Sequence, residues 1–324
     1  METACLLALE AIFCNAVNLF VLITGYFNCT KKTSSLMKGL ELVIQVIFFQ
    51  MVFYILGCIK GSYPFSIKHF VAKFLPQNWF VILYVVMWIL SPYMNIVIEH
   101  VGEKIGAFVL CLFLLFSVYT TAVDSLAELF GINTTGLSSI GMYGSELGYT
   151  IVNFVLMYFI GAYLRLKPHK LKVGSNFALL IICNAAIWVW GVLELKKGLM
   201  IEAVAWEYCN PLVIISAALT FMFFKNQLNF NNGYVNSLAR ASFTCYLIHH
   251  AFYKYINIEK YVNSGVLMML LHIIVTGILV YICSFIAWKI YYLLSRPLIN
   301  KLKALFNKIN IESYLYPHAE QCKE

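Results

Sequence analysis

The stretch from Val266 to Trp288 reads VLMMLLHIIVTGILVYICSFIAW and contains no Asp, Glu, Lys or Arg. A helix needs about 20 predominantly apolar residues to cross the hydrocarbon core of a bilayer, and this stretch is long enough. It is continuously apolar, whereas a transmembrane β-strand alternates between apolar and polar residues. The stretch therefore predicts a membrane-spanning helix.

The rest of the chain has the same character. Of its 324 residues, 61% are hydrophobic and 12% are charged, whereas a soluble domain carries about 25% charged residues. This composition excludes a soluble Rossmann enzyme, a soluble metalloenzyme and a nucleic-acid-binding module. We predict an all-α, polytopic integral membrane bundle that forms a single domain over residues 1–324. Its nine predicted spans are residues 4–27, 40–59, 79–98, 105–123, 149–165, 176–195, 203–224, 239–257 and 265–294.

The basic residues predict how the bundle is oriented. If residues 28–39 face the cytoplasm, the loops on that side hold 15 Lys and Arg, and those on the other side hold seven. Cytoplasmic loops carry such an excess, so we expect a multi-pass protein of the cell membrane with a cytoplasmic C-terminus. Residues 296–324 form a basic cytoplasmic tail in this prediction. The net charge of +8 reflects these loops and does not indicate a nucleic-acid partner.

No bound cofactor or metal is predicted from the sequence. Ten cysteines are present, but none forms a C-x-x-C pair and most lie in apolar runs. Free cysteines of this kind behave as small hydrophobic residues. We therefore expect neither a zinc site nor a disulfide framework.

Ionisable side chains in a membrane are costly and mark candidate functional positions. Six acidic, imidazole or aromatic residues lie in the predicted spans and could face an outer cavity, and an imidazole can relay protons near neutral pH. For each we keep a structural alternative: a solvated carboxylate, a hydrogen-bonded histidine or ordinary aromatic packing. The six candidates are Glu10, Tyr84, Glu207, Tyr246, His249 and His250.

A second candidate group lies in the predicted inner loops. Lys31, Lys32, Arg165 and Lys167 could attract a phosphate-bearing ligand. The alternative is that they anchor the topology and contact anionic membrane lipids.

Five segments, in order along the chain, carry a family resemblance. Together they resemble the integral membrane proteins of acyltransferase family 3. The segments are residues 18–27 (NLFVLITGYF), 78–95 (NWFVILY, continuing to LSPYMN), 159–165 (FIGAYLR), 241–249 (ASFTCYLIH) and 292–298 (YLLSRPL).

The resemblance implies a membrane O-acyltransferase with about ten helices, one more than the spans counted here. The implied donor is cytoplasmic acetyl-CoA. The implied acceptor is a hydroxyl of an extracytoplasmic glycan, as in a capsule, an exopolysaccharide or an O-antigen, or of a lipid-linked oligosaccharide. The six outer candidates would then lie on the acceptor side and the four basic residues on the donor side.

The sequence departs from the family at the catalytic motif. In the family, the catalytic histidine lies at the outer end of the first helix, about ten residues after an arginine. The first helix of this chain instead resembles the family's second helix. No His precedes His69 and no Arg precedes Arg165. The sequence leaves three alternatives open: translation starts upstream with a further helix, the gene is a remnant, or the protein is inactive. We assign no catalytic residue. Alternative functions are a noncatalytic membrane remnant, or a transporter of polysaccharide or lipid-linked sugar, which would be expected to show internal repeats.

Overall fold

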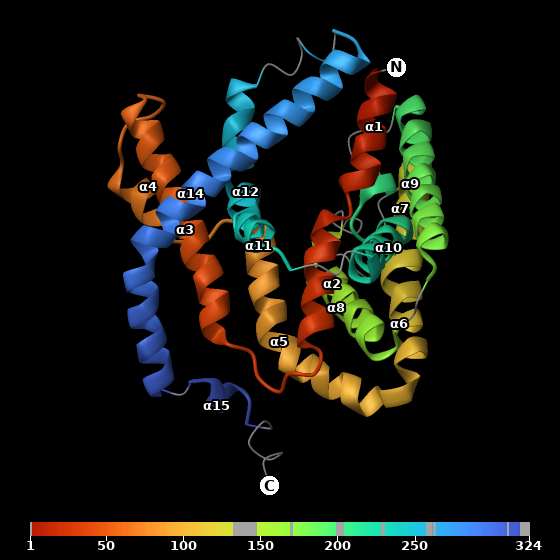
Figure 1. The fold of residues 1–324 in the computed structure, drawn as a ribbon, viewed down its shortest axis with the longest axis horizontal. Coiled ribbons are helices and arrows are strands. Elements are labelled where there is room, and N and C mark those ends of the chain that lie inside the picture. The colour runs from red at the N-terminus through yellow and green to blue at the C-terminus, as the bar shows by residue number, and fades with distance from the viewer. Residues whose placement is uncertain are drawn as a thin grey trace. The chain divides into compact units, whose positions relative to one another are not determined.

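The described part of the chain consists mainly of helices (Figure 1). No strand occurs in the part of the chain that the structure describes, which confirms the all-α prediction. This computed structural model describes residues 2–131, 148–168, 171–198, 204–227, 231–256, 261, 264–309 and 311–317.

The first of two structural units consists of residues 1–2, 35–82 and 230–317. It contains the first turn of α5, which continues into the second unit. Its helices are α3 (Leu36–Ile59), α4 (Ile67–Ala72), the start of α5 (Trp79–Val101), α11 (Gly233–Ala239), α12 (Ser242–Ile248), the 3-10 segment η6 (His249–Tyr255), α14 (Val266–Ile309) and α15 (Ile311–Leu315).

The second unit consists of residues 3–34, 83–229 and 318–324. It contains most of α5 together with the helices that precede and follow it. These are α1 (Glu2–Phe13), α2 (Ala16–Asn28), the 3-10 turn η1 (Gly102–Lys104), α6 (Ile105–Phe113), the π-helical segment η2 (Leu114–Tyr119), α7 (Thr120–Phe130), α8 (Ile151–Leu166), α9 (Val173–Lys196), the 3-10 turn η5 (Val204–Trp206) and α10 (Pro211–Gln227).

Within the described residues, six helical runs are long and apolar enough to cross a membrane. One of them covers two predicted spans, because α5, η1, α6, η2 and α7 form a nearly continuous helical run. The predicted span 149–165 is observed as the shorter apolar helix α8. The six runs are Glu2–Asn28, Leu36–Ile59, Trp79–Ala127, Val173–Lys196, Val204–Gln227 and Val266–Ile309.

The predicted span 239–257 differs from expectation. Its helical part is only the seven-residue α12, which is followed by the 3-10 segment η6. A regular helix of that length is too short to cross the hydrocarbon core. The apolar composition of this segment therefore reflects packing rather than a regular span.

Helices α2 and α8 make the most extensive contact in the second unit, and Figure 1 shows them side by side. The crossing depends on a reciprocal pair of glycines. A Cβ on Gly25 would collide with the backbone of Tyr158, and a Cβ on Gly161 would collide with the backbone of Leu22. Small residues allow helix backbones to approach closely in membranes, so these two glycines set the distance between α2 and α8.

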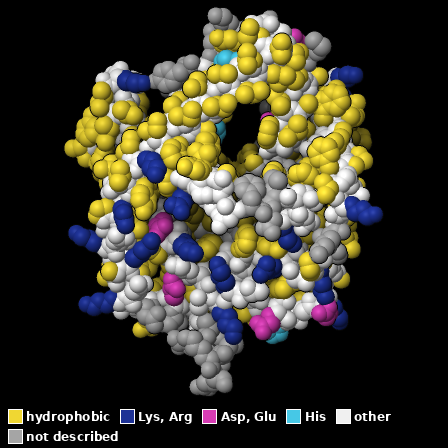
Figure 2. Space-filling model, viewed as in Figure 1, with side chains coloured by type: hydrophobic (Ala, Val, Ile, Leu, Met, Phe, Trp, Pro, Cys, Tyr) yellow, Lys and Arg dark blue, Asp and Glu magenta, His cyan; other side chains and the backbone are white. Residues whose placement is uncertain are grey.

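Helix α14 runs without a break through Pro297 and includes the start of the predicted basic tail. Only a small share of its apolar part is buried, and Figure 2 shows hydrophobic side chains over its surface. Such a surface suits a helix that faces lipid. The last residues of the predicted tail, 318–324, lie outside the described residues.

Candidate functional site

A pocket of about 810 Å³ lies in the second unit, at the end of α2 that continues into residues 29–32. Its size is within the range of sites that hold small molecules and cofactors. Three segments of the chain contribute to it: the residues after α2, the second half of α5 with the turn that follows, and the end of α8. The lining residues are Cys29, Thr30, Lys31, Lys32, Pro92, Asn95, Ile96, Ile98, Glu99, His100, Gly102, Glu103, Leu166 and Lys167.

Asn95 ties these segments together. Its Nδ2 donates to the backbone carbonyls of Asn28 and Lys31, each at 2.7 Å. Its Oδ1 accepts a hydrogen bond of 2.8 Å from the hydroxyl of Tyr158 on α8. Carbonyls at a helix C-terminus lack partners within the helix, so one buried amide satisfies the end of α2 and links it to both neighbouring helices.

The Ser91–Pro92 step lets α5 contain a proline and contact the residues after α2. Because proline lacks an N–H, Pro92 leaves the carbonyl of Trp88 without its usual helical donor. The hydroxyl of Ser91 donates to that carbonyl at 2.8 Å, and it also pairs with the hydroxyl of Ser34 at 2.6 Å. The proline is therefore accommodated inside the helix, and residues 28–34 are held against α5.

The charges that line the pocket are mixed. Lys167 forms an ion pair with Glu103, and the ammonium of Lys31 donates to the side-chain oxygen of Asn28. Lys32 is exposed at the pocket. The pocket therefore offers three ammonium groups beside two carboxylates, those of Glu103 and Glu99.

Cys29 does not provide a reactive thiolate in this pocket. Burial raises the pKa of its thiol, and the nearby Arg165 offsets this only in part. The thiol therefore stays protonated near neutral pH, and it is the thiolate that acts as a nucleophile.

Three of the four predicted donor-side residues line the pocket: Lys31, Lys32 and Lys167. The fourth, Arg165, is exposed and contacts Tyr26. Its Nη1 donates to the Tyr26 hydroxyl at 3.4 Å, and its guanidinium carbon lies 5.2 Å from the centre of the ring. The ammonium of Lys225 lies 4.9 Å from the same centre. Arg165 is thus part of a cation–π group and not of the pocket lining.

The predicted acceptor-side residues of the second unit lie in different environments. Glu10 is exposed on α1. The Tyr84 hydroxyl pairs with Thr24 at 2.8 Å, and its ring stacks on Trp88 with centroids 6.3 Å apart. Glu207 is 5% exposed and accepts a weak hydrogen bond from the thiol of Cys209.

The predicted acceptor-side residues of the first unit lie together. The rings of His249 and His250 have centroids 4.0 Å apart, and both contact Tyr253. Tyr246 lies 6.2 Å from His249, measured between ring centroids, and its hydroxyl donates to the side chain of Asn78 at 3.5 Å. Four aromatic or imidazole side chains from one short segment thus share one cluster.

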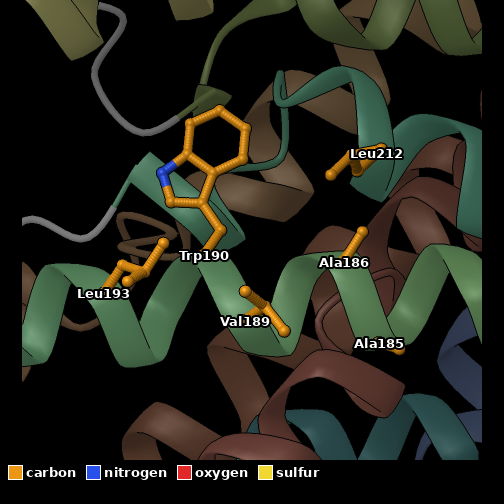
Figure 3. A pocket seen from close by; sticks show the side chains of 6 residues that line it. All are labelled: Ala185, Ala186, Val189, Trp190, Leu193 and Leu212. Carbon is orange, nitrogen blue, oxygen red and sulfur yellow. The ribbon is translucent and has the colours of Figure 1, made fainter.

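A second depression, of about 600 Å³, lies along α9 in the second unit. Figure 3 shows Trp190 and Leu193 on α9 and Leu212 on α10. Its lining among the described residues is aliphatic or aromatic, and the indole N–H of Trp190 is its one polar side-chain group. Its lining suits a lipid chain at the membrane-facing surface.

The long apolar helices define a multi-pass membrane protein, and the second unit contains a pocket lined in part by charged residues. The model of the acyltransferase domain family matches residues 3–289, and the chain belongs to this family, acyltransferase family 3. No curated protein and no solved structure matches the chain. The family predicted from the five segments is confirmed, and with it a membrane acyltransferase in general terms.

Sequence reasoning missed the residues that build the pocket, above all Asn95 and Tyr158. Two signals were available in the sequence. Asn95 is an uncharged polar residue inside an apolar run, and Ser91–Pro92 precedes it by one helical turn. Polar residues in spans commonly form hydrogen bonds between helices, but the sequence does not show which partner each will find.

Proposed function

We propose that this protein transfers an acetyl group from cytoplasmic acetyl-CoA to a hydroxyl of an extracytoplasmic cell-surface glycan or a lipid-linked oligosaccharide. The observation that carries the proposal is the pocket at the end of α2, in a chain that belongs to an acyltransferase family. Its size suits a small-molecule ligand, and its three ammonium groups suit a ligand that carries phosphates. The proposed orientation, with the C-terminus in the cytoplasm, puts this pocket on the donor side.

In the proposed reaction, the oxygen of the acceptor hydroxyl attacks the carbonyl carbon of the thioester. The C–O bond forms, the C–S bond breaks, and CoA leaves as its thiol. A general base accepts the hydroxyl proton and returns it to the sulfur. An imidazole can accept and return a proton, so His249 and His250 are the candidate bases, with Tyr246 and Glu10 as candidates for orienting the acceptor.

The donor half of this proposal is tested by Lys32→Ala. We expect the KM for acetyl-CoA to rise about tenfold in the purified protein, because a charge-assisted hydrogen bond at a partly exposed site contributes about 1–2 kcal/mol. The measurement is transfer of radiolabelled acetyl groups to glycan in proteoliposomes. Lys197→Ala is the matched control, since Lys197 is also exposed and follows the far end of α9.

Three results would contradict the proposal. An unchanged KM in Lys32→Ala would remove the pocket as the donor site. Movement of labelled glycan across the membrane with no acetyl transfer would favour the transporter alternative. A folded chain with neither activity would favour the noncatalytic alternative.

A further inference from the structure

A buried group of acidic and thiol side chains lies in the second unit, apart from the residues that line the pocket. The side-chain ligand atoms of Asp124, Glu207 and Cys209 all lie within 4.8 Å of one another. Asp124 is 7% exposed, Glu207 is 5% exposed and Cys209 is fully buried. Two carboxylates this close in a low-dielectric environment repel one another, and a bound cation relieves that repulsion.

The helix that carries Asp124 presents one polar face to residues 207–210. Ser117, Thr121 and Asp124 are spaced four and three residues apart, so they share that face. The hydroxyl of Ser117 donates to the carbonyl of Cys209 at 2.6 Å. Ser117 lies in the π-helical segment η2, and such segments frequently occur at functional sites.

Thr121, on the same helical run, has a buried hydroxyl group. It lies between Ser117 and Asp124 on the face that meets Cys209 and is only 3% exposed. Its Oγ1 makes no hydrogen bond in the described part of the chain. A buried hydroxyl without a partner is costly, and the three-residue spacing puts Thr121 on the same helix face as Asp124.

The segment that carries Glu207 and Cys209 is held in place before any ligand binds. Asn18 donates to the carbonyl of Tyr208 at 2.8 Å. Asn210 donates to the carbonyl of Val204 at 2.9 Å, and its side-chain oxygen accepts from the amide of Leu212 at 2.9 Å. Ligands fixed in this way bind a metal without a further ordering cost.

The donor set selects among metals. A thiolate is a soft ligand that calcium and magnesium avoid, whereas zinc accepts sulfur and carboxylate oxygen together. In a tetrahedral zinc site, Zn–S and Zn–O bonds of about 2.3 and 2.0 Å put the two ligand atoms about 3.5 Å apart. The Sγ of Cys209 and the Oε2 of Glu207 are separated by 3.5 Å. We infer that Asp124, Glu207 and Cys209 bind a zinc ion, with the Thr121 hydroxyl or a water molecule as the fourth ligand.

Binding would change the charge of the group in a defined way. The Cys209 thiol loses its proton, as zinc binding requires, and the metal then carries two carboxylates and one thiolate. The ion would link α7 to the segment before α10, and so join two helices that are far apart in the sequence. This inference concerns metal binding alone and does not depend on the identity of the acyl donor or acceptor.

The first experiment uses the full-length protein purified without a histidine tag. Elemental analysis should find about one zinc per chain. After a chelator removes the metal, the unfolding temperature should fall, and added zinc should restore it. Reloading with Co²⁺ should produce the near-ultraviolet absorption band of a thiolate–cobalt bond.

Substitutions then locate the site. Cys209→Ser should abolish the cobalt band, whereas Cys111→Ser should retain it, because Cys111 is an exposed cysteine of the same unit. Asp124→Asn should lower the affinity for zinc at least tenfold and leave the band of any bound cobalt in place. If Cys209→Ser does not fold, Asp124→Asn and the metal titration of the unaltered chain still decide the question.

Two outcomes would overturn the inference. One is a folded, chelator-treated chain that gives neither a cobalt band nor a shift in unfolding temperature with zinc; the two carboxylates would then share a proton. The other is a cobalt band that persists in Cys209→Ser.

Discussion

The pocket of the second unit and the histidine cluster of the first unit are built in different ways. In the pocket, Asn95 joins the end of α2 to α5 and α8, over separations of more than 60 residues along the chain. In the cluster, His249, His250 and Tyr253 are near neighbours in one short segment. A site built from distant segments depends on how the helices pack. In a local cluster, a side chain can be replaced with a smaller loss in the free energy of unfolding.

The largest loss of stability should come from Gly25→Ala, which alters the helix packing on which the pocket depends. The added Cβ would meet the backbone of Tyr158, which cannot move aside as a side chain can. Overpacking of this kind costs about 3 kcal/mol, and it should separate α2 from α8 and open the pocket. The measurement is the unfolding temperature in detergent.

Gly174→Ala is the control for that substitution, because a Cβ on Gly174 would meet nothing within 4 Å. It should leave the unfolding temperature unchanged or raise it slightly, since alanine favours the helix. Equal unfolding temperatures in the Gly25 and Gly174 variants would show that the close crossing does not support the fold.

A smaller but still large effect is expected from Asn95→Ala. The change removes three hydrogen bonds and takes this donor from the carbonyls of Asn28 and Lys31, of which that of Asn28 still accepts from the Lys31 amide at 2.9 Å. We expect a loss of about 2–3 kcal/mol in the free energy of unfolding, because uncompensated buried polar groups are costly. Labelling of the Cys29 thiol should also become faster.

Tyr158→Phe is the matched comparison, since it removes only the hydrogen bond to Asn95 Oδ1. It should cost about 1 kcal/mol. If the two variants were equally stable, the carbonyls of Asn28 and Lys31 would not depend on Asn95.

The smallest effect on stability is expected from His249→Ala. Its Nδ1 lies within hydrogen-bond distance of the backbone carbonyls of Cys245 and Tyr246 on the same turn, so we expect a loss below about 1 kcal/mol in the free energy of unfolding. Acetyl transfer should nevertheless fall about 100-fold if the imidazole acts as the general base. Unchanged glycan acetylation in a folded His249→Ala protein would remove this residue from the site.

The sequence was sufficient to predict the all-α membrane fold and the family, because hydropathy and ordered local motifs are properties of short segments. It also indicated Lys31, Lys32 and Lys167, since basic residues gather in the loops between spans. Arg165 shared that pattern, but its side chain meets the ring of Tyr26 instead of the pocket. The direction of a side chain on the last turn of a helix depends on the neighbouring helix, which local sequence does not specify.

The group of Asp124, Glu207 and Cys209 was even harder to predict from local sequence. Asp124 and Cys209 are separated by more than 80 residues, and their spacing matches no zinc motif. They come together in the folded chain, where α7 packs against η5, the turn just before Glu207. The prediction of a span at 239–257 was limited in another way. Its apolar composition is sufficient for a span, but the structure forms the short helix α12 and the 3-10 segment η6 there.

The unbroken course of α14 has a mechanical consequence. A helix of 44 residues is about 66 Å long, whereas the hydrocarbon core of a bilayer is about 30 Å thick. Roughly half of this rod therefore exceeds the length that the hydrocarbon core requires, and its charged part begins near Lys289, the first charged residue after Val266. A change in bilayer thickness or tilt at one end would move the charged end like the tip of a lever, and Pro297 is the point at which the rod is most easily bent.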